Sequence, residues 1–204
     1  MTLANTLLMP QAFLPLYLFE PKYCKMLNDV LDDHRMFAVA LAKKIHPTKR
    51  FSVPYSMIGI GVARACVKNS DGTFHLILQG IARAKILHIT QEIPYRMAQV
   101  KVMPSRETMS VETEALMLKV IELILERIEK LNLCSSHKMF QFLKDLKDPD
   151  IFSDIISYNF VNNLQQRQKL LETLDVQQRL RELILIFNQE ASTSSARSTF
   201  TSPK

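Results

Sequence analysis

Leu14-Pro-Leu-Tyr-Leu-Phe-Glu-Pro-Lys-Tyr-Cys-Lys-Met-Leu27 is the stretch that decides how this chain begins to fold. Its leucines alternate with Pro15 and Tyr17, which is the pattern of a strand with one buried face. Pro15 has no N–H to donate to a neighbouring strand, so we expect this strand at an edge of its sheet or at the start of a ladder.

Pro21 then changes the period of the pattern. Proline suits the first turn of a helix, where its missing donor would have no intrahelical partner in any case. The apolar residues that follow form one stripe at helical spacing: Tyr23, Met26, Leu27, Val30 and Leu31. The stretch therefore predicts a strand that leads directly into an amphipathic helix, and it contains no pattern of catalytic residues.

The composition is that of an ordinary globular protein. The chain has 204 residues, of which 47% are hydrophobic and 23% are charged, enough for one larger domain or two small subdomains. Residues 1–19 carry no charge, but they lack a basic start and are interrupted by Pro10 and Pro15, which argues against a signal peptide. No later stretch approaches the roughly 20 apolar residues that span a bilayer. We therefore expect a cytoplasmic protein with no membrane segment.

The cysteines predict neither a disulfide framework nor a zinc site. Cys24, Cys66 and Cys134 are odd in number, widely separated and form no Cys-x-x-Cys pair. That usage fits a reducing compartment, and we interpret the three as small core residues. We expect no metal and no cofactor.

Residues 36–102 have the character of strands. Glycine occurs only between positions 59 and 80, and glycine inside strands marks bulges or the corners of a curved sheet. Asn69–Gly72 has the composition of a hairpin turn. The predicted strands are residues 36–42, 58–67, 73–79, 83–89 and 95–102. Gly80 is expected to interrupt the chain between the third and the fourth. Short strands with glycine kinks favour a small closed or half-closed barrel.

After Pro104 glycine disappears and the apolar period becomes 3.6 residues. Ser110, Asp148 and Asp175 are placed to cap helices. The predicted helices run from Ser110 to about Leu131, from Ser136 to Lys147, from Pro149, from Leu164 to Leu174 and from Val176. We therefore expect an α+β protein with a β subdomain over residues 1–105, a helical bundle over residues 106–190 and a disordered Ser/Thr-rich tail over residues 191–204.

Positive charge is concentrated in the β subdomain. Through residue 105 there are 13 Lys and Arg against 6 Asp and Glu, and after it 13 against 14. Two groups could form a nucleic-acid or polyanion patch: Lys43, Lys44, Lys49 and Arg50 around Pro47, and Arg64, Arg83 and Arg96 on successive strands with Phe74 and Tyr95 nearby. The more common interpretation is that such residues are solvated or protect a sheet edge.

Enzyme motifs are absent from the sequence. It has no Gly-Lys-Ser/Thr of a P-loop, no His-Glu-x-x-His and no Gly-x-Ser-x-Gly. One pair remains: if Asn69–Gly72 is the hairpin loop, Cys66 lies opposite His75, where a thiol and an imidazole could interact. A working site needs further ligands or an orienting carboxylate, so we do not favour catalysis.

Several short motifs, in order, resemble the Lon protease N-terminal domain family. They are Leu7-Leu-Met-Pro10, Leu14-Pro-Leu-Tyr-Leu-Phe-Glu-Pro-Lys-Tyr23, Gly59-x-Gly61-x-Ala63, Asp71-Gly72, Gly80-Ile-Ala-Arg83, Tyr95-x-x-Ala98-x-Val100, Asp148-Pro149 and Leu174-Asp175-Val-Gln-Gln-Arg179-Leu. The resemblance covers about residues 3–190. It implies a PUA-like β pseudo-barrel followed by a helical bundle, in a stand-alone member that lacks the ATPase and Ser-Lys peptidase modules of Lon.

The resemblance also implies a function in recognition without catalysis. In Lon this region is implicated in engaging substrate proteins, so we expect unfolded or hydrophobic polypeptides as partners, with a separate ATPase or protease as a further partner. The candidate peptide-binding residues are Phe13, Tyr17, Phe19 and Tyr55, which lie in uncharged segments beside prolines. The alternative hypothesis is a PUA-like RNA-binding module that uses the basic face of the β subdomain.

Overall fold

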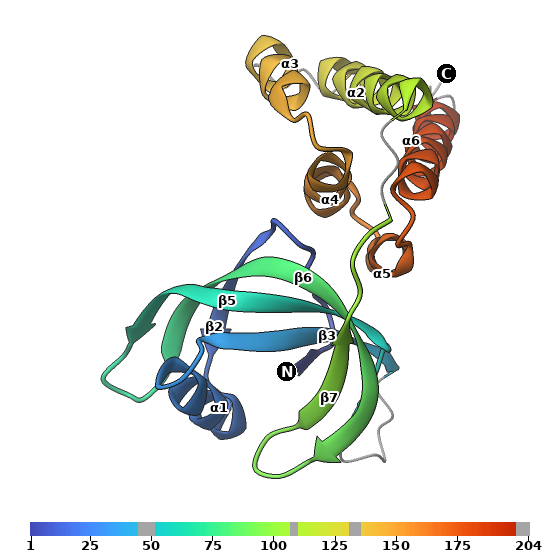
Figure 1. The fold of residues 1–204 in the computed structure, drawn as a ribbon. Coiled ribbons are helices and arrows are strands. Elements are labelled where there is room, and N and C mark those ends of the chain that lie inside the picture. The colour runs from blue at the N-terminus through green and yellow to red at the C-terminus, as the bar shows by residue number, and fades with distance from the viewer. Residues whose placement is uncertain (45–51, 107–109, 131–135, 199–204) are drawn as a thin grey trace. The chain divides into compact units, whose positions relative to one another are not determined.

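The computed structural model describes residues 1–44, 52–106, 110–130 and 136–198. Within these residues, seven strands and six helices follow one another in an α+β arrangement, as the sequence predicts (Figure 1). The elements are β1 (Thr2–Leu3), β2 (Phe13–Leu18), α1 (Pro21–Leu31), β3 (Met36–Lys44), β4 (Val53–Pro54), β5 (Met57–Lys68), β6 (Phe74–Gln91), β7 (Met97–Val102), α2 (Val111–Lys130), α3 (Ser136–Asp145), α4 (Pro149–Phe160), α5 (Leu164–Glu172) and α6 (Val176–Ser198).

The chain divides into two compact units, and the first includes one segment from the helical half of the sequence. The first consists of Met1–Pro104 with Asn163–Glu172, and the second of Ser105–Asn162 with Thr173–Lys204. The sequence-based division at residue 105 lies at the same place, but it leaves α5 with the helical bundle. Side chains near α5 explain the difference: Gln168 Nε2 donates to the Met57 carbonyl at 3.0 Å, and Arg83 Nε donates to the Leu171 carbonyl at 3.2 Å.

Strand β6 is the spine of the first unit. It pairs antiparallel with β5 along one edge, while β2 and β7 share its other edge, β2 along the first half and β7 along the second. The full order is β1-β3-β5-β6-β2, with β4 on β3. The prediction of a break at Gly80 is wrong: β6 continues through this residue, and the local irregularity is absorbed as register shifts in its pairing with β5.

The sheet needs glycine at two positions because the segment before β2 passes over it with its backbone in contact with the backbone of the strands. Leu7, Leu8 and Met9 are almost fully buried. A Cβ on Gly59 would overlap the Leu8 carbonyl, and one on Gly80 would overlap the Met9 carbonyl. The two positions thus require glycine for close approach and not for an unusual backbone conformation.

Strand β2 and helix α1 form as the local pattern predicts. Leu14 and Leu18 face inward and are nearly fully buried, and β2 is the last strand in the sheet order, as Pro15 predicts. Pro21 occupies the first turn of α1, and Met26 and Leu27 are its buried residues. Each such burial contributes on the order of 1.5–3 kcal/mol.

The second unit is helical in its described residues, and its helices begin where the caps predict. Asp148 Oδ1 accepts from the Ile151 N–H at 2.9 Å, and Asp175 Oδ1 accepts from the Gln178 N–H at 2.9 Å. The Gln178 side chain bonds Glu182, so the second half of the expected capping box does not form. Helix α6 continues to Ser198, beyond residue 190 at which the sequence predicts the bundle to end.

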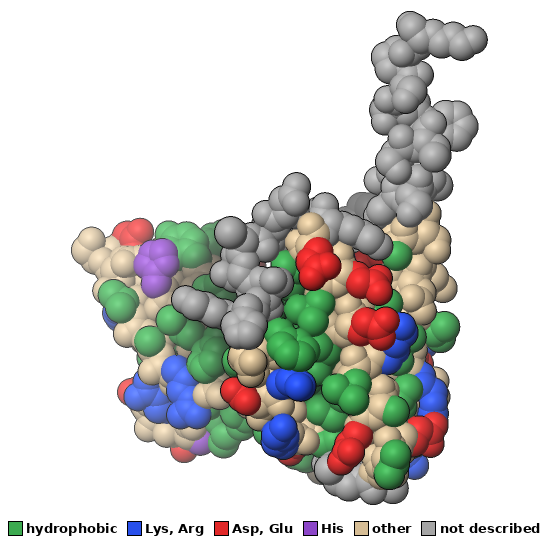
Figure 2. Space-filling model, turned by 90° about the horizontal axis from the view of Figure 1, so that it is seen from above, with side chains coloured by type: hydrophobic (Ala, Val, Ile, Leu, Met, Phe, Trp, Pro, Cys, Tyr) green, Lys and Arg blue, Asp and Glu red, His purple; other side chains and the backbone are tan. Residues whose placement is uncertain are grey.

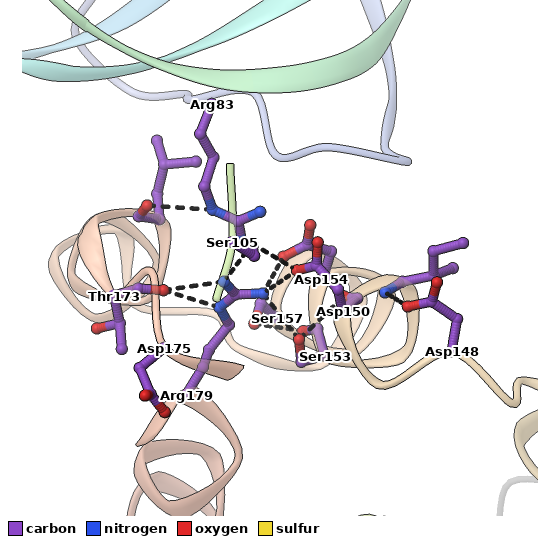
Figure 3. Close-up of polar contacts among 12 residues, drawn as sticks. Arg83, Ser105, Asp148, Asp150, Ser153, Asp154, Ser157, Thr173, Asp175 and Arg179 are labelled. Atoms are coloured by element: carbon purple, nitrogen blue, oxygen red, sulfur yellow. Dashed lines mark hydrogen bonds and ion pairs between the residues drawn. The ribbon is translucent and has the colours of Figure 1, made fainter. Parts of the chain in front are cut away.

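The second unit is organised around the fully buried guanidinium of Arg179 (Figure 3). Its Nη1 donates to Asp150 Oδ1 at 2.6 Å, to Asp154 Oδ1 at 3.1 Å and to Ser153 Oγ at 2.9 Å. Its Nη2 donates to the Thr173 carbonyl at 2.9 Å. Arg179 therefore connects the start of α6 with α4 through charge-assisted bonds inside the unit.

Candidate functional site

The outward side of β2 carries large apolar side chains where a strand exposed to water usually carries polar ones. Phe13 is 57% exposed and Tyr17 50% exposed, and Pro15 lies between them. Phe19, immediately after the strand, is 63% exposed. The alternation that buries the leucines therefore places an aromatic row on the opposite side of the same strand.

The neighbouring strands extend this row into a surface. Tyr17 is paired with His75 on β6, and His75 with Val67 on β5. Pro15 is paired with Ile77, and Ile77 with Ala65. Paired residues of antiparallel strands share a face. We call the surface formed by these residues and the two flanking phenylalanines the β2 face: Phe13, Pro15, Tyr17, Phe19, Ala65, Val67, His75 and Ile77.

Tyr17 lies at the centre of the β2 face and contacts rings on both sides. Its ring centroid is 5.9 Å from that of Phe19, in a stacked arrangement, and 4.9 Å from that of His75. Beside it is a depression of about 420 Å³, whose lining includes Tyr17, Val67 and Ile77. Such a surface can accept apolar or aromatic side chains of a partner, because they displace water from an apolar wall.

The free edge of β2 is poorly suited to adding another strand. Gly80 N donates to the Ala12 carbonyl at 2.8 Å, so in this register the backbone groups of residues 14, 16 and 18 are directed toward β6. Those of residues 13, 15 and 17 are directed toward the open edge, and Pro15 has no N–H. The β2 face therefore offers side-chain contacts more readily than a backbone ladder.

The structure brings together three of the four candidate peptide-binding residues and separates the fourth. Phe13, Tyr17 and Phe19 share the β2 face. Tyr55 lies between β4 and β5, where its hydroxyl donates to Gln165 Oε1 of α5 at 2.6 Å and its ring lies 5.6 Å from Lys43 Nζ. Tyr55 therefore holds α5 on the sheet and is not part of the same surface.

The three arginines expected to form one basic face do not do so. Arg83 is 3% exposed and its Nε bonds the Leu171 carbonyl, because α5 covers this part of the sheet. Arg96 pairs with Glu92 at 2.9 Å and donates to the Ser52 carbonyl. Arg64 lies over the sheet beside the β2 face, with its Nε 2.6 Å from Gln79 Oε1. Phe74, expected beside them, is buried.

Of the predicted basic loop, only part is described. Lys43 is exposed; Lys44 ends β3, and Lys49 and Arg50 lie outside the described residues. In the view of Figure 2, the lysines and arginines of the described residues occur in small groups interspersed with carboxylates and apolar side chains. No observation favours the RNA-binding alternative.

The Cys66–His75 pair does not form. His75 is paired with Val67, and Cys66 is paired with Leu76, so the thiol and the imidazole lie on opposite faces of the sheet. The hairpin is one residue out of the expected register because Asn69 N donates to the Thr73 carbonyl, which closes a turn of three residues in place of the expected four. Burial raises the pKa of the Cys66 thiol, although Arg35 acts in the opposite direction. The thiol form is therefore favoured over the nucleophilic thiolate.

The described residues contain no group of three His, Cys, Asp or Glu side chains placed to hold a metal ion. None of the helices in this part of the chain has both the length and the hydropathy to cross a membrane.

Comparison with known proteins places this geometry in a family. A family model described as the ATP-dependent protease La (LON) substrate-binding domain matches residues 1–189. The chain belongs to this family. The Lon protease of Dictyoglomus thermophilum is 23% identical over 188 residues, which cover 92% of this chain and 24% of that protein. Lon protease 2 of Bdellovibrio bacteriovorus is 29% identical over 178 residues, or 84% of this chain and 22% of that protein.

A solved structure supports the same assignment at the level of fold. The N-terminal domain of the Mycobacterium avium complex Lon protease superposes with a TM-score of 0.71 at 19% identity, covering 92% of this chain and 96% of that one. The predicted family and fold class, a curved sheet with one early helix followed by helices, are confirmed. The chain spans about a quarter of the length of the curated Lon relatives it matches. Residues 1–189 match the substrate-binding domain, and these 204 residues hold neither an ATPase nor a peptidase domain.

Sequence reasoning missed the half of the β2 face that β5 and β6 supply. Val67 and Ile77 carry no signal of their own in the sequence, and His75 stood out only as a possible partner of Cys66. His75 and Ile77 alternate with the buried residues Phe74, Leu76 and Leu78, which marks them as outward. Only the pairing register places His75 between Tyr17 and Val67. A pattern of apolar residues on both sides of two paired strands is the signal that could have found them.

Proposed function

We propose that this Lon-family substrate-binding domain binds unfolded or apolar polypeptide segments on the β2 face, without catalysing a reaction. The observation that carries the proposal is the cluster around Tyr17, in which three aromatic rings and two aliphatic side chains stay in water beside a depression. Leaving such a cluster exposed forgoes burial energy, which marks it as an interaction surface.

The mode of binding follows from the edge of β2. Because Pro15 removes the central donor of that edge, a bound segment is held by its side chains and keeps its backbone hydrated. Such binding tolerates many sequences, provided that they present apolar or aromatic groups. We further propose that the domain acts in the cytoplasm, where Cys24 and Cys66 stay reduced, and that bound segments pass to an ATPase or protease.

The experiment is a fluorescence-anisotropy titration of the chain with labelled apolar peptides. Replacing both Tyr17 and Phe19 by alanine should weaken binding by about 10-fold or more, since aromatic anchors at the centre of an interface contribute about 1–2 kcal/mol each. The matched control is Phe142→Ala, which removes another half-exposed aromatic ring (50%) from the second unit and should leave affinity unchanged. Equal affinities for all three proteins would contradict the proposal.

A second titration tests the mode of binding. Methylating alternate backbone amides of the peptide blocks strand addition but leaves its side chains in place. The affinity should change less than threefold. A loss of binding with the methylated peptide would show that the segment adds to the β2 edge as a strand.

A further inference from the structure

The concave side of the first unit's sheet is aliphatic and only partly covered. Ala40, Ile58 and Ala84 are fully buried there, whereas the side chains packed against them are only partly buried: Ala38, Ile60, Ile86 and Val100. These residues come from four different strands, β3, β5, β6 and β7. The apolar wall is therefore built by the curvature of the sheet and not by any one segment.

A cavity of about 620 Å³ occupies this concave side. Helix α1 closes one side of it with Met26 and Val30. Exposure increases from its floor to its mouth: Ile58 is 2% exposed, whereas Ile81 is 41% and Met97 48% exposed. The volume lies within the range of about 300–1,000 Å³ typical of small-molecule sites.

Several polar groups of the cavity lining already have partners within the chain. The Met1 amine donates to the Ala38 carbonyl at 2.8 Å, the Tyr95 hydroxyl donates to Asp29 Oδ2 at 2.8 Å, and Arg96 Nε lies 2.9 Å from Glu92 Oε2. A charged ligand would have to break one of these pairs to gain a partner of its own. The rim therefore favours an occupant without charge.

The wall also discriminates against a polypeptide backbone. Strands β3, β5 and β6, which carry Ala40, Ile58 and Ala84 of the cavity floor, each have partner strands on both sides, so their backbone groups are bonded. A peptide backbone entering the cavity would lose its bonds to water without finding partners, at a cost of roughly 1–3 kcal/mol for each buried group. A small molecule without amide groups avoids this penalty.

We infer that this cavity binds a small, uncharged, apolar molecule, such as a neutral aromatic or branched aliphatic compound. The site is separate from the β2 face, because the two share no lining residue. The inference does not depend on the proposed polypeptide binding.

The probe for this site is N-phenyl-1-naphthylamine, which is uncharged at neutral pH and fluoresces in apolar surroundings. It should bind the chain saturably, with one site. Replacing Ala98, which lines the cavity from β7, by phenylalanine should fill the space and weaken binding at least 10-fold. Tyr17→Ala, on the β2 face, should leave the affinity for the probe within twofold.

A measurement on the unsubstituted chain guards against misfolding of the Ala98→Phe variant. Methyl NMR resonances of Ile60, Ile86 and Val100 should shift on adding the probe, and those of Ile77 and Val67 should not. Absence of saturable binding would overturn the inference, as would probe-induced shifts confined to the β2 face. Displacement of the probe by an apolar peptide, with the same cavity methyl groups shifting, would also overturn it, because the occupant would then be a polypeptide.

Discussion

The two units of this protein differ in the kind of side chain that each gathers into a cluster. The first leaves apolar side chains exposed, both on the β2 face and at the mouth of the concave cavity. The second instead removes charge from water: Arg179 and Asp154 are at most 1% exposed. Exposed apolar area supplies a driving force for association, whereas a buried ion pair fixes one arrangement of the helices that carry it.

This difference shows which unit carries the binding surface and which unit uses its polar side chains to hold its helices together. Strands can expose one row of side chains while burying the next, so the first unit combines a packed interior with a binding surface. In the second unit, the contacts of Arg179 reach both α4 and the Thr173 carbonyl before α6. The polar residues of this network lie inside the unit and stabilise its fold.

The largest expected effect comes from breaking the buried network of the second unit. Arg179→Ala removes the buried guanidinium that pairs with Asp150 and Asp154 and should lower the free energy of unfolding by about 3–5 kcal/mol. The measurement is a urea titration followed by helical circular dichroism. The control is Arg181→Ala, two residues along α6, whose pair with Glu112 is exposed and should contribute less than about 1 kcal/mol. Similar losses in both variants would show that burial does not set the difference.

An intermediate effect is expected where the first unit's sheet meets the segment before β2. Gly80→Ala places a Cβ against the Met9 carbonyl, and the backbone on both sides must shift. We expect a loss of about 1–3 kcal/mol in the free energy of unfolding, as for overpacked cores. Gly72→Ala is the comparison: its Cβ meets open space, and only its φ of +84° opposes the change, by about 1 kcal/mol. If Gly72→Ala were the more damaging variant, close approach would not be the reason for glycine at position 80.

The smallest effect concerns a surface pair at the rim of the cavity. The hydrogen bond from Tyr95, and secondarily Lys25, holds the pKa of Asp29 below its ordinary value. The pair therefore contributes stability above the ordinary pKa of aspartate, and this stability is lost as the pH falls through the lower folded-state pKa. Tyr95→Phe should raise the pKa of Asp29 toward that of a free aspartate.

The change in pKa can be followed by NMR titration of the Asp29 carboxyl carbon. Asp71 is an internal reference, because its pKa is lowered by Thr73 and should not respond to the substitution. An unchanged pKa at Asp29 would assign its shift to Lys25 instead. Since Asp29 is exposed, unlike Asp154, this result also sharpens the contrast between the two units.

Local sequence predicted the elements well because its signals act over a few residues. Pro15 predicted an edge strand, Pro21 the start of α1, and Asp148 a helix cap, and the structure confirms each. The same local signals failed at Gly80, where a glycine suggested a break and the strand continues. There the glycine makes room for the backbone of Met9, 71 residues earlier in the sequence, which no local window can include.

The candidate site was predictable only in part for the same reason. The prolines and aromatic residues of the β2 stretch pointed to Phe13, Tyr17 and Phe19. They pointed equally to Tyr55, but in the structure the hydroxyl of Tyr55 donates to Gln165 of α5. Arg83, expected on a basic surface, is buried because α5 packs on the first unit although it is encoded within the helical half.

The sequence by itself determined the order of strands and helices, the inward side of β2 and the family to which the chain belongs, because periodicity, caps and short motifs are properties of neighbouring residues. Only the tertiary structure decided that Tyr17, His75 and Val67 form one surface, that Cys66 and His75 face apart, and that four strands enclose a cavity. Those outcomes depend on strand register and sheet curvature, where a shift of one residue exchanges the two faces.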